Sequence, residues 1–128
     1  MEFFKIKKRK IGKNSPTFII AEIGLNHNGS LLLCKKLISE AKKCGADAVK
    51  LQIADSKYSY NTDTKSYKIF KKNTLPFKDL RKVTSYAKRK KIILFATPGD
   101  FKSLEICKKL KFPAIKISSG LLTNEPLI

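Results

Sequence analysis

The chain has 128 residues, of which 42% are hydrophobic, and it carries 28 lysines and arginines against 10 acidic residues. This length fits one domain, and the apolar share is large enough to build a core, which excludes an intrinsically disordered chain. No stretch approaches the roughly 18 consecutive apolar residues of a membrane span, and the first ten residues lead into no apolar signal-peptide region. We therefore expect a cytoplasmic protein without a membrane partner.

The strong positive charge raises the question of a nucleic-acid partner, because cationic surfaces gain affinity for phosphates by releasing counterions. Only Arg9, Arg81 and Arg89 are arginine, and all other cations are lysine. Arginine is preferred for bidentate contacts to phosphates and bases, so its scarcity argues against nucleic acid. The lysines fall on polar faces of predicted helices, and a basic field also attracts small anionic substrates. We expect no nucleic-acid partner.

The predicted elements alternate along the chain. A basic turn between two short apolar segments predicts a β-hairpin in residues 1–13. Apolar runs typical of strands covered on both faces follow at residues 17–21, 48–52, 92–96 and 114–117. Amphipathic helices are predicted between them, the first capped by Ser30 and stopped by Gly45, the second starting at Pro76 and the third at Asp100.

One long irregular segment interrupts this alternation. Residues 53–74 are polar and rich in lysine, serine and tyrosine. A loop of this length in a compact domain is typical of a lid or a binding loop. A short helix around residues 67–71 is the alternative.

The order of elements predicts an α/β protein with a parallel sheet built from right-handed crossovers. About four strand–helix units are half of the eight in a (β/α)8 TIM barrel, which takes about 250 residues. The pattern alone therefore leaves two interpretations, a small open doubly wound sheet or part of a larger barrel.

Polar residues concentrate at the carboxyl ends of the predicted strands, where parallel sheets place their functional loops. These residues are Glu22, Lys50, Gln52, Thr97, Lys116, Ser118 and Ser119. A charge on an apolar strand is costly to bury unless it is paired, so mutual neutralisation of Glu22, Lys50 and Lys116 is a purely structural interpretation. Three charges at equivalent strand ends favour a function instead, namely an anion pocket in which Glu22 holds a lysine in place.

The remaining motifs give no clear indication of a catalytic or metal-binding site. The segment from Gly24 to Gly29 is rich in glycine but is neither a GxGxxG motif nor a P-loop, and it is typical of a tight turn. His27 is the only histidine, and we expect it to be neither catalytic nor a metal ligand. The three cysteines show no paired spacing and are expected to be reduced and buried.

Four segments together resemble the N-acetylneuraminate (sialic acid) synthase family. They are residues 20–29, 45–52, 96–98 and 115–120, the last continued by residues 123–127. The resemblance runs over nearly the whole chain in the right order. It implies that residues 14–128 are the first half of a TIM-barrel synthase domain. The remaining strands and an antifreeze-like domain would lie beyond Ile128, in a protein that is usually a homodimer.

The resemblance also implies a reaction and a set of site residues. The family joins phosphoenolpyruvate to N-acetylmannosamine or a related amino sugar in an aldol-type condensation that releases phosphate. A divalent metal, typically Mn²⁺, polarises the sugar aldehyde, and its ligands are expected outside this chain. The resemblance assigns phosphoenolpyruvate binding to Lys50, Thr97, Lys116 and Ser119. Catalytic roles fall on Glu22, Lys50 and Lys116, and a sugar contact on Gln52.

Two positions depart from the family pattern. Leu121 stands where an acidic residue often reaches the sugar, and Gly99 replaces a larger residue. Two sugar substrates are therefore compatible with the sequence: N-acetylmannosamine, and a diacetamido sugar that leads to legionaminic or pseudaminic acid. We expect little or no synthase activity from this chain alone.

Three alternatives remain beside this interpretation. A deoxy-octulosonate phosphate synthase would share the chemistry, but the order of the four motifs argues against it. A non-catalytic basic module would bind nucleic acid or an acidic partner. The last alternative is a truncated remnant without a function.

Overall fold

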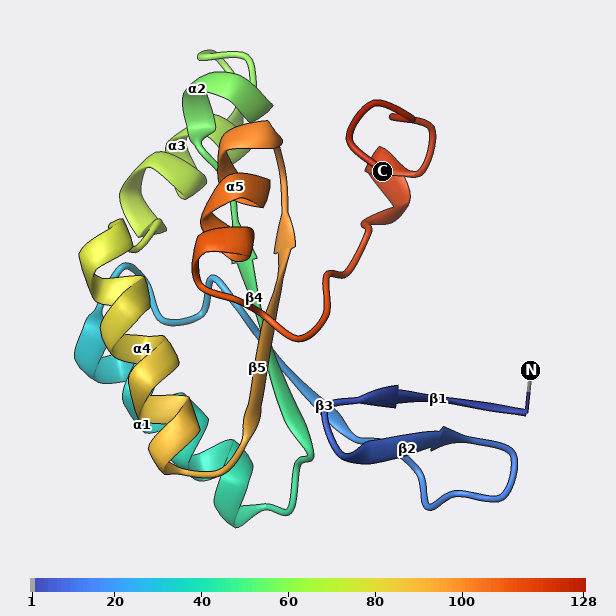
Figure 1. Cartoon of the computed structure of the whole chain (residues 1–128). Helices are drawn as coiled ribbons and strands as arrows, with labels where there is room; N and C mark the ends of the chain where they lie inside the picture. The colour runs from blue at the N-terminus through green and yellow to red at the C-terminus, as the bar shows by residue number, and fades with distance from the viewer. Residues whose placement is uncertain (1) are drawn as a thin grey trace.

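A parallel sheet forms the centre of the computed structural model, which describes residues 2–128. Its strands β3 (Ile20–Gly24), β4 (Ala48–Ile53) and β5 (Ile93–Pro98) lie in the order β3-β4-β5. The register sets Glu22 beside Lys50 across β3 and β4, and Gln52 beside Thr97 across β4 and β5. The expected mixed α/β architecture with a parallel sheet is confirmed (Figure 1).

The connecting helices begin where their capping residues predict. Helix α1 (Leu31–Lys43) starts after Ser30, whose side chain accepts a hydrogen bond from Leu33 N, and α4 (Phe77–Arg89) starts after Pro76. Helix α5 (Phe101–Lys109) starts after Asp100, whose side chain accepts from Ser103 N. Gly45 follows α1 with a φ of +84°, a left-handed conformation that favours glycine. Side-chain caps thus fix the starts of α1 and α5 locally, and α4 begins at a proline without a side-chain cap.

The fourth predicted strand does not form. Residues 114–117 make only an isolated bridge between Ala96 and Ile115, in which Lys116 N donates to Ala96 O at 3.1 Å. Pro113 has no N–H to donate, and within residues 2–128 no further strand pairs with the outer side of this segment. The first strand also lies later than predicted, at residues 20–24 instead of 17–21.

The segment 53–74 is more ordered than a loop. It contains α2 (Ser56–Ser59) and α3 (Lys65–Asn73), so the alternative of a helix around residues 67–71 is confirmed and extended. Asp55 caps α2 by accepting from Lys57 N, and Thr64 caps α3 by accepting from Tyr67 N. These short polar caps give a local signal that the residues 53–74 carry a helical structure.

The core lies between the sheet and the helices α1, α4 and α5, which gather on one side of it (Figure 1). Alternate strand residues point to opposite faces of a sheet. Val49, Leu51 and Ile53 accordingly join the buried cluster, while Gln52 is exposed. The site residues therefore belong to the sheet face that these helices do not cover.

The cysteines are free, but their burial differs. Burial raises the pKa of both Cys34 and Cys107 to about 12, so these thiols stay protonated and inert. The expectation that all three are buried is wrong for Cys44, which is exposed after the last turn of α1.

Strands β1 (Phe3–Ile6) and β2 (Arg9–Gly12) pair antiparallel as a hairpin at the opposite end of the sheet from the site. Arg9 Nε lies 3.2 Å from Asp47 Oδ1, and Asp47 Oδ2 accepts from Ile19 N at 2.8 Å. The hairpin is therefore tied to the amino ends of β3 and β4. No helix within residues 2–128 is long and apolar enough to cross a membrane.

Candidate active site at the carboxyl ends of the strands

Lys50 is the centre of a polar cluster that joins all three strands. Its Nζ lies 2.6 Å from Glu22 Oε2 on β3 and donates to Thr97 Oγ1 on β5 at 3.2 Å. The Lys50 side chain is only 10% exposed, whereas that of Glu22 is 52% exposed. The sequence-based expectation that Glu22 holds a lysine in place thus describes the observed pair.

This arrangement leaves one ammonium proton of Lys50 for a ligand. A lysine ammonium has three donors, and Glu22 and Thr97 occupy two of them. A positive charge in such a nearly buried position attracts an anion more strongly than one in water, because the surroundings screen it less. The half-exposed carboxylate of Glu22 is open to solvent and to a reacting group. The cluster can bind an anion and exchange a proton beside it.

Gln52 reaches toward the same cluster from β4. A Cβ atom built on Gly24 would lie 3.2 Å from Glu22 Oε1 and 3.6 Å from Gln52 Oε1. The side chains of Glu22 and Gln52 therefore approach each other above Gly24, which has no side chain of its own. Gly24 also has a φ of +55°. The strand pairing is irregular here, between Glu22 and Gly24. Glycine at this position keeps the approach to both oxygens open.

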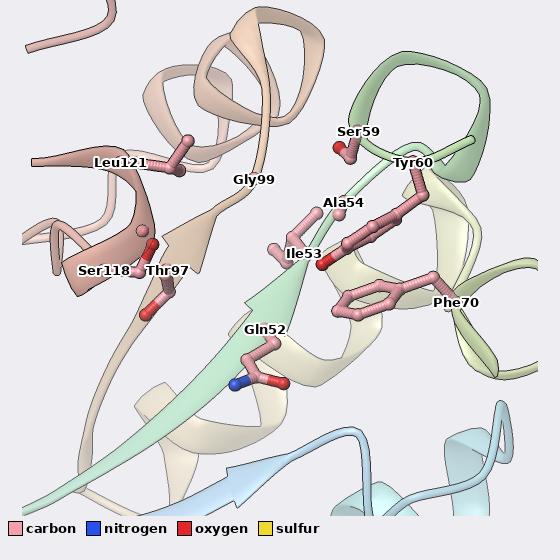
Figure 2. A pocket seen from close by; sticks show the side chains of 11 residues that line it. Gln52, Ile53, Ala54, Ser59, Tyr60, Phe70, Thr97, Gly99, Ser118 and Leu121 are labelled. Atoms are coloured by element: carbon pink, nitrogen blue, oxygen red, sulfur yellow. The ribbon is translucent and has the colours of Figure 1, made fainter. Parts of the chain in front are cut away.

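A hollow of about 280 Å³ opens beside the cluster (Figure 2). Gln52 and Thr97 reach it from the strands, and Tyr60 and Phe70 form one wall with ring centroids 4.9 Å apart. The full lining is Gln52, Ile53, Ala54, Ser59, Tyr60, Phe70, Thr97, Gly99, Ser118, Gly120 and Leu121. The aromatic wall was not predicted, and the only signal for it was the four aromatic residues within the polar segment 53–74, of which Tyr60 and Phe70 form the wall.

Lys116 and Ser119 form no salt bridge or side-chain hydrogen bond with the Lys50 cluster among the described residues. The Lys116 side chain is exposed and joins no salt bridge among the residues that the structure describes. A mutual neutralisation of Glu22, Lys50 and Lys116 is therefore wrong for Lys116. Ser119 is exposed at the start of the 3₁₀-helix η1 (Ser119–Leu121), and it is Ser118 that lines the hollow.

Asp100 anchors residues 54–59, which border the hollow and are called the roof segment below. Its Oδ2 accepts hydrogen bonds from Asp55 N and Ser59 Oγ, both at 2.8 Å, and from Ser103 Oγ at 2.9 Å. Gly99 permits this close approach, because a Cβ there would lie 2.7 Å from the Cβ of Ala54. Sequence reasoning assigned Asp100 only to a helix start and noted Gly99 only as a departure from the family pattern. The structure shows that both hold residues 54–59 against β5.

Asp55 makes a second link in this segment. Its Oδ2 lies 2.6 Å from Lys102 Nζ, and that hydrogen bond holds the pKa of the Asp55 carboxyl below its usual value. Lys102 is exposed, so the pair adds little stability. The main link between the roof segment and α5 is therefore the buried Asp100 carboxylate.

His27 is a structural residue in the turn after β3. It is 2% exposed, and its Nδ1 accepts a hydrogen bond from Gly29 N at 3.2 Å. Burial lowers the pKa of its imidazole from the usual 6.5, because a charged ring loses hydration there. The neutral ring thus holds the turn that leads into α1.

We expect the stability of the chain to fall as the pH decreases from 7 to 5.5. The unfolded chain gains a proton on His27 near pH 6.5, while the folded chain resists protonation until the pH reaches its lowered pKa. The stabilisation is therefore fully present above pH 6.5 and is lost below it, by at most about 1.4 kcal/mol per pH unit. Urea unfolding of wild type and His27→Gln at several pH values checks this. Equal slopes in both proteins would contradict a role for His27, the only histidine.

The described residues do not offer a metal site of their own. Within residues 2–128 no three His, Cys, Asp or Glu side chains come together in a group that could hold a metal ion. The Glu22 carboxylate is paired with Lys50, and His27 is buried with its Nδ1 engaged. These donors do not fit a divalent metal, which needs several ligands at once.

The fold and the site define an α/β protein with a polar site at the carboxyl ends of parallel strands. The chain matches the NeuB family model over residues 37–128, and it belongs to the NeuB family. It is 44% identical to an uncharacterized protein of Methanocaldococcus jannaschii, over 100% of this chain and 38% of that protein. It is 35% identical to the N,N'-diacetyllegionaminic acid synthase of Campylobacter jejuni, over 88% of this chain and 38% of that one.

A solved structure gives the same result for the fold. The sialic acid synthetase of Leptospira borgpetersenii superimposes with a TM-score of 0.92 at 33% identity, covering 98% of this chain and 44% of that one. The chain thus spans less than half the length of these relatives. The resemblance to the sialic acid synthase family that the motifs indicated is confirmed.

Proposed function

We propose that this chain is part of a synthase that condenses phosphoenolpyruvate with an amino sugar and releases phosphate. The observation that carries the proposal is the nearly buried Lys50 ammonium, paired with Glu22 and Thr97 at the carboxyl ends of three parallel strands. Membership of the NeuB family and the names of its relatives as sialic and legionaminic acid synthases support it.

The proposal includes a fold larger than the described sheet. Residues 14–128 would form the first half of a (β/α)8 barrel, after the hairpin in residues 1–13. Two features support this: the helices cover only one face of the sheet, and the bridge at Ile115 extends the parallel order beyond β5. The rest of the barrel, the antifreeze-like domain and the homodimer are part of the proposal, as is a Mn²⁺ ion that orients the sugar aldehyde.

In the proposed reaction, different residues would bind the substrate and exchange protons. Lys50 and Thr97 bind the anionic groups of phosphoenolpyruvate, joined by Lys116 and Ser119 from the segment beside β5. Carbon 3 of phosphoenolpyruvate attacks the aldehyde carbon, water adds at carbon 2, and phosphate leaves. Glu22, held by Lys50 and half-exposed, is placed to exchange a proton with the reacting groups. The catalytic residues of the proposal are therefore Glu22, Lys50 and Lys116.

The hollow would receive the amino sugar. Gln52 supplies a polar contact, and Leu121 lies across the hollow from the aromatic pair Tyr60 and Phe70 (Figure 2). An apolar wall suits the methyl of an acetamido group better than a hydroxyl, because an unpaired hydroxyl loses hydration there. Leu121 therefore favours a diacetamido sugar over N-acetylmannosamine as the acceptor.

The experiment that tests the function has two readouts on the purified 128-residue chain. Calorimetric titration with phosphoenolpyruvate is expected to show saturable binding that Lys116→Ala removes while the fold persists, since Lys116 is exposed. Phosphate release with phosphoenolpyruvate, N-acetylmannosamine and Mn²⁺ is expected to be absent or very slow, since the chain spans 38% of its curated relatives. Absence of phosphoenolpyruvate binding would contradict the proposed function. Full metal-dependent turnover would contradict only the expected inactivity.

A further inference from the structure

Two hollows on the surface of helices α1 and α4 are lined by cations. The first, of about 440 Å³, lies between the two helices and is lined by Lys35, Lys78, Arg81, Lys82, Ser85 and Arg89. The second, of about 730 Å³, lies between the hairpin turn and the ends of both helices. Its cations are Lys7, Lys8, Arg9, Lys42, Lys88 and Lys91, and Asp47, Gly45, Ala46, Ile92 and Ile93 complete its lining. We call the two together the basic face.

The fold holds these cations together without compensating most of them. In the first hollow, only Lys82 has an acidic partner within residues 2–128, Asp79 at 3.2 Å, and in the second hollow Arg9 is paired with Asp47 at 3.2 Å. Lys35, Arg89 and Lys90 crowd around the ring of Tyr86 at 5.6 to 5.7 Å from its centroid. These cation–π contacts are attractive, but Lys78 lies three and four positions before Arg81 and Lys82 on α4, and like charges at these spacings repel and cost the isolated chain stability. A bound polyanion would remove that repulsion.

The placement of the arginines distinguishes this face from a merely solvated lysine surface. Arginine is scarce in the chain as a whole, yet Arg81 and Arg89 line the first hollow and Arg9 lines the second. These are the three arginines of the chain. Arg9 is already paired with Asp47, whereas Arg81 and Arg89 form no salt bridge among the described residues, so a general preference for lysine does not explain these two arginines. Arginine is the side chain that binds phosphates in a bidentate manner.

The lining indicates which polyanion fits. Lys78 and Arg89 are eleven positions apart on α4, so the row of cations spans about 16 Å, which is enough for several phosphates. No apolar or aromatic side chain lines the first hollow, so it lacks the anchor of a protein interface and the stacking platform for single-stranded bases. A duplex backbone presents a phosphate charge every 3.4 Å per strand and needs neither.

We propose that the basic face binds the phosphate backbone of duplex nucleic acid without sequence preference. The face lies on the helical side of the sheet, and no residue lines both it and the hollow at the strand ends (Figure 1). Binding there is therefore independent of the proposed synthase chemistry. The proposal departs from the expectation, drawn from composition alone, that nucleic acid is no partner.

The test compares two variants that lose the same charge. Arg81→Gln with Arg89→Gln removes two cations from the basic face, and Lys65→Gln with Lys68→Gln removes two exposed cations from α3, which do not line it. Fluorescence anisotropy measures binding of each folded protein to a labelled 20-base-pair DNA duplex of arbitrary sequence, at several salt concentrations. Circular dichroism establishes that each variant is folded.

We expect wild type to bind the duplex at low salt and the Arg81/Arg89 variant to bind at least about tenfold more weakly, with a salt slope reduced by about 2. The Lys65/Lys68 variant should stay within about twofold of wild type, because it leaves the basic face intact. Equal losses in both variants would overturn the proposal, since binding would then follow net charge. No binding by wild type, or equal competition by polyglutamate at the same charge concentration, would overturn it as well.

Discussion

Replacement of Lys50 by methionine is expected to weaken phosphoenolpyruvate binding about 10- to 100-fold, because it removes a charge-assisted contact worth about 1.5 to 3 kcal/mol. Methionine keeps the length of the side chain and its apolar stem but cannot donate to an anion. Lys50 is 10% exposed, so water replaces its charge poorly. Calorimetric titration of both proteins with phosphoenolpyruvate measures the difference.

The control for Lys50→Met is Lys57→Met, which removes an exposed lysine from α2 near the same hollow. Its affinity should stay within about threefold of wild type, because Lys57 neither lines the hollow nor joins the cluster of Lys50, Glu22 and Thr97. The fold should survive Lys50→Met, since Glu22 is 52% exposed and regains hydration when its partner is lost. An equal loss of binding in both variants would show that the anion does not use Lys50.

Replacement of Asp100 by alanine is expected to lower the free energy of unfolding by about 3 kcal/mol. About 1 kcal/mol of this comes from the lost cap of α5, and the rest from donors that lose their acceptor, Asp55 N and Ser59 Oγ. Asp100 is 7% exposed, so water does not readily take the place of the carboxylate. Urea unfolding measures the change.

The same variant should also loosen the roof of the hollow. Residues 54–59 are held to β5 and α5 mainly through Asp100, so limited proteolysis should cut this segment sooner than in wild type. Asp63→Ala is the matched control, because Asp63 is exposed and its carboxylate makes no hydrogen bond or salt bridge among the described residues. A stability loss no larger than that of Asp63→Ala would contradict the role of Asp100.

Local signals account for the parts of the fold that were predictable. Ser30, Pro76 and Asp100 mark helix starts because capping depends on residues within one turn. The meeting of Lys50 with Thr97 was also foreseeable, since parallel strands end at the same edge of a sheet. The pairing with Glu22 follows from the same rule.

Residues 114–117 show where local signals are insufficient. Their apolar run predicts a strand as well as that of β5 does, yet they form only one bridge. A strand needs hydrogen-bonding neighbours, and an apolar run does not say whether they are present. For the same reason, its place at a predicted strand end did not bring Lys116 into the cluster of Lys50, Glu22 and Thr97.

The sequence by itself determined the alternation of three parallel strands with α1, α4 and α5, the starts of these helices, and the family to which the chain belongs. Tertiary structure alone decided that Asp100 fastens residues 54–59, that Tyr60 and Phe70 form one wall, and that three arginines share one face. Caps and periodicity act over a few residues and are written in the local sequence. Contacts such as Asp100 to Asp55 join residues 45 positions apart, and only packing of the whole chain brings them together.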